Sequence, residues 1–193
     1  MKLKLLSLLL LLLSINCISQ TLDNLKKETK KVYDANYLME FEAVVAQSYP
    51  KIIETIGQDK MLELLDLDYQ NDDFRYRLQL VNPIFIYSDI KKIDDKSYCV
   101  ISYKNPVRIF YEKKLSMNDG IKKATQIKEE TQATQVTFEP KRNSFNVRRN
   151  SKFIAIADTS TKMEWKFFNL DDVNQKKVFD SLCSESVKKE LGL

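Results

Sequence analysis

The side chains that could carry acid–base chemistry in this chain are carboxylates and tyrosines, because its 193 residues include no histidine. The lack of histidine excludes serine–histidine and cysteine–histidine nucleophilic systems and the commonest zinc sites. Gly57, Gly120 and Gly192 lie far apart, so the sequence has no glycine-rich phosphate loop. We therefore expect neither a metal ion nor an organic cofactor.

The carboxylates form no strong catalytic pattern. Three aspartate pairs fall at predicted turns or helix starts, where capping explains them: Asp72-Asp73, Asp94-Asp95 and Asp171-Asp172. Glu40, Glu42 and Glu54 lie on the predicted N-terminal helices. If one of them faced an interior cavity, burial would raise its pKa and make it a candidate base. A solvated helix face is the alternative explanation.

Aromatic residues give a more useful indication of a site. Some lie on the predicted helices and others on the predicted strands, so the two sets could face each other across a cavity. The cavity candidates are Tyr37, Phe41, Tyr49, Tyr98, Tyr103 and Trp165. The alternative is a filled core in which the tyrosine hydroxyls reach the rim.

A basic surface is the second candidate. Residues 104–152 hold 12 basic and 5 acidic side chains, and residues 141–149 interleave charge with Phe145. Arg142, Arg148 and Arg149 are the candidate contacts to an anionic partner. A plain solvated hairpin is the other interpretation. We do not expect nucleic acid, because the protein is predicted to be exported.

Export is predicted from residues 1–19, which combine Lys2 and Lys4 with an apolar run too short to span a bilayer. Cleavage would leave Gln20 first. Lipidation of Cys17 is the alternative, although residues 14–16 match that pattern poorly. We expect a periplasmic or extracellular protein with no stable membrane span.

Residues 20–193 are of a size expected for a single domain, with helices first and strands after them. A helix is predicted over 32–48, ending before Pro50, and two short helices over 50–56 and 58–65. Strand patterns cover 74–87 and 97–111, with a break near Asn105-Pro106. A polar insertion at about 112–150 is predicted to contain a helix over 116–134 and short strands around Pro140. A hairpin over 153–168 follows, and then two helices, the first beginning at Asp172.

The segment Tyr49-Pro50-Lys51-Ile52-Ile53, followed by Gly57 and Lys60-Met61, resembles the nuclear-transport-factor-two-like cone superfamily, especially its small secreted bacterial members. Trp165-Lys166-Phe167 resembles the tryptophan-x-phenylalanine of their last strand. Gln58 departs from the glycine pair of these proteins. The resemblance implies a curved, mainly antiparallel sheet packed against a long N-terminal helix and two short helices. It implies no single function, because the superfamily holds enzymes, binders and adaptors.

Two functions are expected from these observations. The first is an exported, non-enzymatic binding or interaction module that uses the cone cavity or the sheet face, where a homodimer could also form. The alternative is a small isomerase- or dehydratase-like enzyme with a cavity carboxylate. Cys99 and Cys183 are expected to be small buried hydrophobic residues rather than a disulfide.

Overall fold

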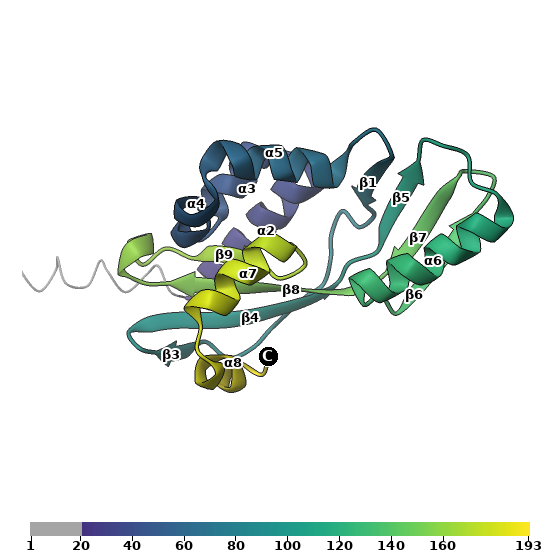
Figure 1. Ribbon diagram of the computed structural model, residues 1–193. Helices are drawn as coiled ribbons and strands as arrows, with labels where there is room; N and C mark the ends of the chain where they lie inside the picture. Colours follow the sequence, from purple (N-terminus) through teal and green to yellow (C-terminus); the bar gives the residue numbers. More distant parts are fainter. Residues whose placement is uncertain (1–20) are drawn as a thin grey trace, which may run out of the picture.

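The computed structural model describes residues 21–193, so the predicted signal peptide and Cys17 lie outside the described residues. The chain is an α+β protein built on two antiparallel sheets, which confirms the predicted fold class (Figure 1). The helices are α2 (Leu22–Leu38), α3 (Phe41–Gln47), α4 (Pro50–Ile56), α5 (Gln58–Tyr69), α6 (Met117–Thr131), α7 (Val173–Leu182) and α8 (Glu185–Leu191). The strands are β1 (Phe74–Leu78), β2 (Phe85–Tyr87), β3 (Lys91–Ile93), β4 (Lys96–Lys104), β5 (Val107–Tyr111), β6 (Gln135–Glu139), β7 (Ser144–Arg148), β8 (Asn150–Ala157) and β9 (Lys166–Asn169).

The prediction of one uninterrupted helix over 32–48 is wrong. The helix α2 ends at Leu38, and the left-handed backbone of the next residue, Met39 (φ 59°), turns the chain into the separate helix α3. This break lets consecutive helices reach different faces of one sheet, because Tyr33 and Val44 belong to different hydrophobic clusters. The next two helices begin as predicted, with Gly57 at φ 88° between them, but α5 continues to Tyr69 rather than stopping at Leu65.

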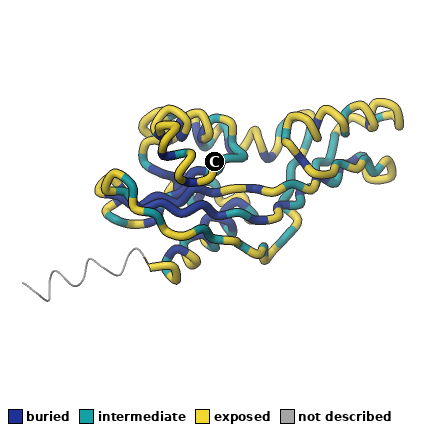
Figure 2. Tube along the Cα trace, turned by 90° about the horizontal axis from the view of Figure 1, so that it is seen from below, coloured by how far each residue is buried: buried dark blue, intermediate teal, exposed yellow. Residues whose placement is uncertain are grey.

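The first sheet has the strand order β2-β4-β8-β9, and β3 also pairs with β4. Alternate residues of β4 point to opposite faces, and both faces are covered. Cys99 and Ile101 pack with Leu25, Val32 and Tyr33 of α2. Tyr98 and Val100 pack in a second cluster with residues of α3, α4, α7 and α8. Figure 2 shows the resulting buried strands beneath mostly exposed helices.

The second sheet has the order β1-β5-β7-β6, and α6 covers one of its faces (Figure 1). This sheet and α6 account for most of the polar insertion predicted at 112–150. Ser116 caps α6 by accepting a hydrogen bond from the Asp119 N–H. Gly120 lets the helix approach β6 closely, since a Cβ there would lie 2.2 Å from the ring of Phe138.

The two sheets meet at a shared bend. Lys104 pairs with Asn150 at the end of the first sheet, and Val107 pairs with Val147 in the second, so the register is unbroken. Between them the Asn105 N–H donates to the Arg149 carbonyl at 2.9 Å. The predicted break at Asn105-Pro106 is therefore confirmed as the point where one long hairpin passes from one sheet into the other.

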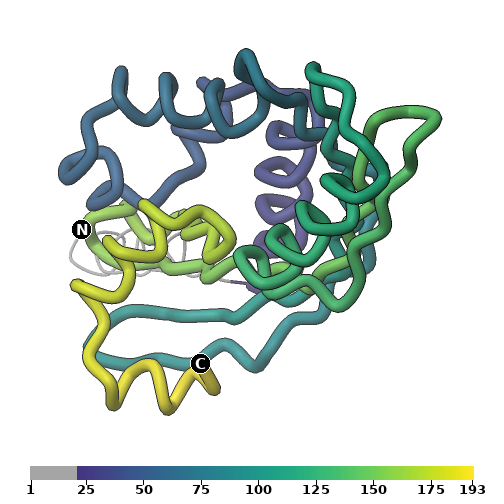
Figure 3. The backbone as a smooth tube through the Cα atoms, turned by 45° about the vertical axis from the view of Figure 1, so that its right-hand side comes forward, coloured from purple at the N-terminus to yellow at the C-terminus, as the bar shows by residue number. Residues whose placement is uncertain are grey.

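The C-terminal helices complete the covered sheet. Asp172 caps α7 as predicted, since its carboxylate accepts from the N–H groups of Asn174 and Gln175. Helix α8 lies beside β3 and β4 (Figure 3) and ends at Gly192 in the left-handed region. Cys99 and Cys183 are free and buried. No helix within residues 21–193 is long and apolar enough to cross a membrane.

Candidate functional site

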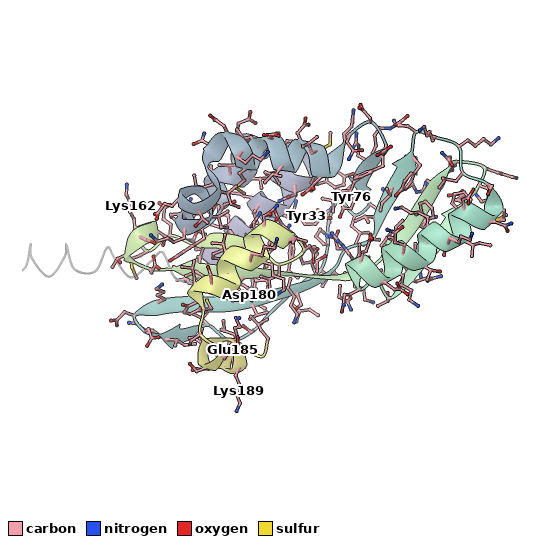
Figure 4. The ribbon with its side chains drawn as sticks, viewed as in Figure 1. Tyr33, Tyr76, Lys162, Asp180, Glu185 and Lys189 are labelled. Atoms are coloured by element: carbon pink, nitrogen blue, oxygen red, sulfur yellow. The ribbon has the colours of Figure 1, made fainter. Side chains whose placement is uncertain are left out.

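A cavity of about 410 Å³ lies at the bend between the two sheets. Its walls come from α2, α5, the strands on both sides of the bend, the C-terminal end of α6 and the first residues of α7. Its aromatic lining residues are Tyr33, Tyr69, Phe74, Tyr76, Tyr103, Tyr111 and Phe153. Figure 4 shows Tyr33 and Tyr76 close together near the place where α5 meets the second sheet. The site is thus formed by segments far apart in the sequence.

An ion pair between Arg149 and Asp171 lies in the cavity wall. Arg149 Nη2 is 3.0 Å from Asp171 Oδ2 and donates a 2.6 Å hydrogen bond to the Tyr76 hydroxyl. Ser151 donates to the same carboxylate of Asp171. The Arg149 and Asp171 side chains are only 14% and 17% exposed. The expectation that Arg149 belongs to an exposed basic surface is therefore wrong, because the bend turns its side chain inward.

The cavity tyrosines differ in how their hydroxyl groups are bonded. Tyr33 donates to the Leu80 carbonyl at 2.6 Å, and Tyr69 donates to Asn36 Oδ1 at 3.2 Å. Tyr76 accepts from Arg149. Within residues 21–193 the Tyr103 hydroxyl forms no hydrogen bond, although its ring packs edge-on against Tyr33 and Phe85. Tyr103 therefore keeps a donor and acceptor available to an occupant of the cavity.

Burial keeps these tyrosines protonated. It raises the pKa of Tyr76 to about 12, although the positive charge of Arg149 acts in the opposite direction. It also raises the pKa values of Tyr69 and Tyr103 well above the usual range for a phenol. For Arg149, burial opposes the charged form, but Tyr76 and Asp171 raise its pKa overall. The wall thus presents neutral phenols beside a charged but paired guanidinium.

Charged groups around the cavity are mainly acidic. The lining carboxylates are Asp68, Glu130, Asp171 and Asp172, and the lining cations are Lys123 and Arg149. Asp172 is used as the cap of α7, and Glu130 accepts a hydrogen bond from Gln126. Burial, together with the nearby Asp172, raises the pKa of Asp68. Asp68 is therefore the lining carboxylate most suited to hold a proton.

Two enclosed polar atoms at the bend have no hydrogen-bond partner within residues 21–193. They are Nε of Arg149 and Oδ1 of Asn105, which belong to residues opposite each other in the ladder. Unpaired buried polar atoms are uncommon in folded proteins because each carries a desolvation penalty. At the bend, therefore, one donor and one acceptor have no hydrogen-bond partner in the described chain.

The sequence candidates are dispersed in the structure. Of the six aromatic candidates, Tyr103 lines the cavity, whereas the other five pack elsewhere. Phe41 packs against Tyr69 with ring centroids 5.2 Å apart, and Tyr37 and Trp165 belong to the cluster beneath α2. Tyr98 is buried beneath the other helices, and the buried Tyr49 donates a 2.6 Å hydrogen bond to Asp158.

The other two basic candidates remain at the surface. Arg142 and Arg148 are exposed, and Arg142 Nε lies 3.6 Å from Glu139. The face of the second sheet opposite α6 also carries Arg75 and Arg108, whose guanidinium groups lie over the ring of Phe110 at 5.7 and 5.9 Å. This open face is separate from the cavity because alternate strand residues point to opposite sides of the sheet.

Sequence reasoning missed most of the cavity residues, including Tyr69, Tyr76, Asp68 and Asp171. Tyr76 alternates with Arg75 and Arg77 in β1, which was a signal that its side chain points inward. Asp171 had a capping explanation as part of an aspartate pair, but only Asp172 caps α7. No signal in the sequence showed that these two segments meet.

No group of three potential metal ligands occurs in the part of the chain that the structure describes. No protein-family model matches the sequence, and comparisons with curated proteins and with solved structures give no match. The fold and the site thus define an α+β protein with a tyrosine-lined cavity between two sheets.

Proposed function

We propose that this protein is an exported, non-enzymatic binding module that encloses a small organic ligand in the cavity at the bend. The observation that carries the proposal is the cavity of about 410 Å³ with five tyrosines and two phenylalanines in its lining. Sites for small molecules have volumes of roughly 300–1,000 Å³, apolar walls and a few polar groups. The resemblance to secreted cone-fold proteins is consistent with the proposal and remains a prediction.

Binding is favoured over catalysis because most polar groups of the cavity already have structural partners. Asp171 pairs with Arg149, Asp172 caps α7, and the hydroxyls of Tyr33 and Tyr69 donate to protein oxygens. A catalytic group needs a proton it can give or take within reach of the substrate. The cavity wall is thus better suited to orienting a ligand than to transferring protons.

The test is a binding screen with a variant that fills the cavity. Small neutral fragments suit a cavity of this size and would be screened by ligand-observed NMR. Thr131 lines the cavity and donates its hydroxyl to the Ile127 carbonyl, so Thr131→Trp should block it. Thr125 lies on the exposed side of the same helix and donates to the Ile121 carbonyl, so Thr125→Trp is the matched control.

Fragments should bind to the wild-type protein and to Thr125→Trp, and binding should be lost in Thr131→Trp. An absence of hits on the wild-type protein would contradict the proposal. So would hits whose binding is the same in the two tryptophan variants, because such fragments would occupy a different site.

A second candidate is a small isomerase- or dehydratase-like enzyme with Asp68 as its acid or base. The observation in its favour is the raised pKa of Asp68 at the cavity wall. Turnover of a fragment hit that is lost in Asp68→Asn, with binding retained, would favour this enzyme over a pure binding module.

A further inference from the structure

The cavity lining contains hydrogen-bond donors that have no partner in the described chain. Tyr103 has a hydroxyl with no hydrogen bond inside residues 21–193. Tyr76 accepts from Arg149 through its oxygen, which leaves the hydroxyl hydrogen of Tyr76 to donate elsewhere. Arg149 itself keeps an unpaired Nε. Two neutral phenols thus have donor capacity that the described chain leaves unused, whereas the unpaired Nε of Arg149 is enclosed.

The strand geometry places these donors together. Tyr103 pairs with Ser151, and Asn105 lies opposite Arg149, so all four side chains emerge on one face of the hairpin. Arg149 contacts Tyr76 both by its hydrogen bond and by lying over the ring at 5.7 Å. The donors therefore lie close together in the cavity wall.

The charges of the lining select against an anionic ligand. Arg149 is already neutralised by Asp171, and Lys123 is the other lining cation. Of the four carboxylates that line the same cavity, Asp171 is the one with an ion pair within residues 21–193. A ligand carboxylate would meet repulsion from these carboxylates, which outnumber the lining cations by four to two, and the repulsion is moderate because Asp68 and Glu130 are exposed.

We infer that the cavity takes a neutral aromatic or alicyclic ligand whose carbonyl oxygen accepts hydrogen bonds from Tyr76 and Tyr103. This inference rests on the proposed function and gives its ligand a chemical class. The flat ring of such a ligand would pack against the remaining aromatic side chains. These contacts stabilise the ligand without requiring hydrogen-bond geometry. The carbonyl oxygen accepts two hydrogen bonds through its two lone pairs.

The test uses two matched pairs of one-ring probes titrated by protein-observed NMR. Acetophenone and α-methylstyrene have nearly the same shape, but only acetophenone has an acceptor oxygen. Benzamide and benzoate differ in charge. Acetophenone should bind about five- to tenfold more tightly than α-methylstyrene, the difference expected for one or two net hydrogen bonds. Benzamide should bind at least about fivefold more tightly than benzoate, because charge repulsion of this size costs about 1 kcal/mol.

The variant Tyr103→Phe should reduce the preference for acetophenone to about twofold or less. Its fold should be retained, because the ring is kept and the lost hydroxyl has no hydrogen bond in residues 21–193. Tyr98→Phe removes the hydroxyl of a tyrosine that packs outside the cavity and should leave the preference unchanged. Equal binding of acetophenone and α-methylstyrene to the wild-type protein would overturn the inference alone. A failure of all four probes, and of the fragment screen, would overturn the proposed function with it.

Discussion

Arg149 and Asp171 form a nearly buried ion pair at the bend between the two sheets, with Nη2 and Oδ2 3.0 Å apart. The pair joins the crossing point of the long hairpin to the loop before α7. Burying one charge without the other is strongly unfavourable, whereas losing both together can be tolerated. The pair therefore fixes the loop before α7 against the hairpin in the wall of the cavity.

Removal of one partner should destabilise the protein. We expect Arg149→Leu to lower the free energy of unfolding by about 3 kcal/mol, because it leaves Asp171 buried without a counter-charge. The neighbouring Arg148 is exposed, so Arg148→Leu should change stability by less than about 0.5 kcal/mol. Urea denaturation of both variants measures the difference. Equal stabilities would show that the ion pair does not hold the bend.

The close contact of α6 with β6 makes Gly120 intolerant of a side chain. Alanine normally favours a helix over glycine by about 1 kcal/mol. Here its Cβ would lie 2.2 Å from a ring carbon of Phe138, which is itself stacked on Phe145. We expect Gly120→Ala to destabilise the protein by about 1–3 kcal/mol as an overpacking substitution.

The same change in a Phe138→Leu background should be less harmful than in the wild-type background, because the smaller side chain leaves room. Thermal melting of the two single variants and the double variant tests this coupling. A Gly120→Ala variant more stable than the wild-type protein would place α6 away from Phe138.

Asp158 should make part of the free energy of unfolding depend on pH in the acid range. Burial alone would raise its pKa, but hydrogen bonds from Ser160, Tyr49 and the backbone, with Lys96 3.7 Å away, lower the pKa overall. A pKa below the ordinary Asp value of about 3.9 means that this stabilisation is present above that pH. It is lost as the pH falls through the folded-state pKa.

The measurement is the urea midpoint of the wild-type protein and Asp158→Asn between pH 7 and pH 3. The difference between them should be largest near neutral pH and should shrink below about pH 4. Asp66→Asn, at an exposed position on α5, serves as the control and should follow the wild-type curve. A gap between wild type and Asp158→Asn that is constant with pH would refute the linkage.

Trp165 should be part of the core rather than of a binding surface. Its side chain is 1% exposed and packs in the cluster beneath α2. Truncation to alanine should cost about 3–5 kcal/mol. Ile84 is 84% exposed, so Ile84→Ala should stay within about 0.5 kcal/mol of the wild-type protein. Differential scanning calorimetry of both variants checks the prediction, and similar melting temperatures would contradict it.

Local signals predicted much of the fold. Pro50 and Gly57 marked the boundaries of α4, Asp172 marked the start of α7, and Asn105-Pro106 marked the bend. These features depend on backbone preferences of single residues, which are visible in a sequence. The break at Met39 carried no such signal, because a methionine in the left-handed region is imposed by the packing of α2 and α3 on different clusters.

The candidate site was less predictable because it depends on tertiary contacts and not on the preferences of single residues. Its residues come from strands, helices and loops whose contacts depend on how the two sheets share one hairpin. Arg149 shows the difficulty, because it sits in a strongly basic segment and still points inward to Asp171. Charge patterning describes the surface on average and does not identify a single buried cation.

A small ligand is proposed to bind among the tyrosines at the bend. The most direct measurement follows the ring signals of ¹³C-labelled tyrosines, assigned with single Tyr→Phe variants, while the best fragment hit is added. The signals of Tyr76 and Tyr103 should shift with one saturating binding curve, whereas those of Tyr49 and Tyr98, which pack outside the cavity, should stay in place. Shifts of Tyr49 or Tyr98 without shifts of Tyr76 and Tyr103 would contradict the account.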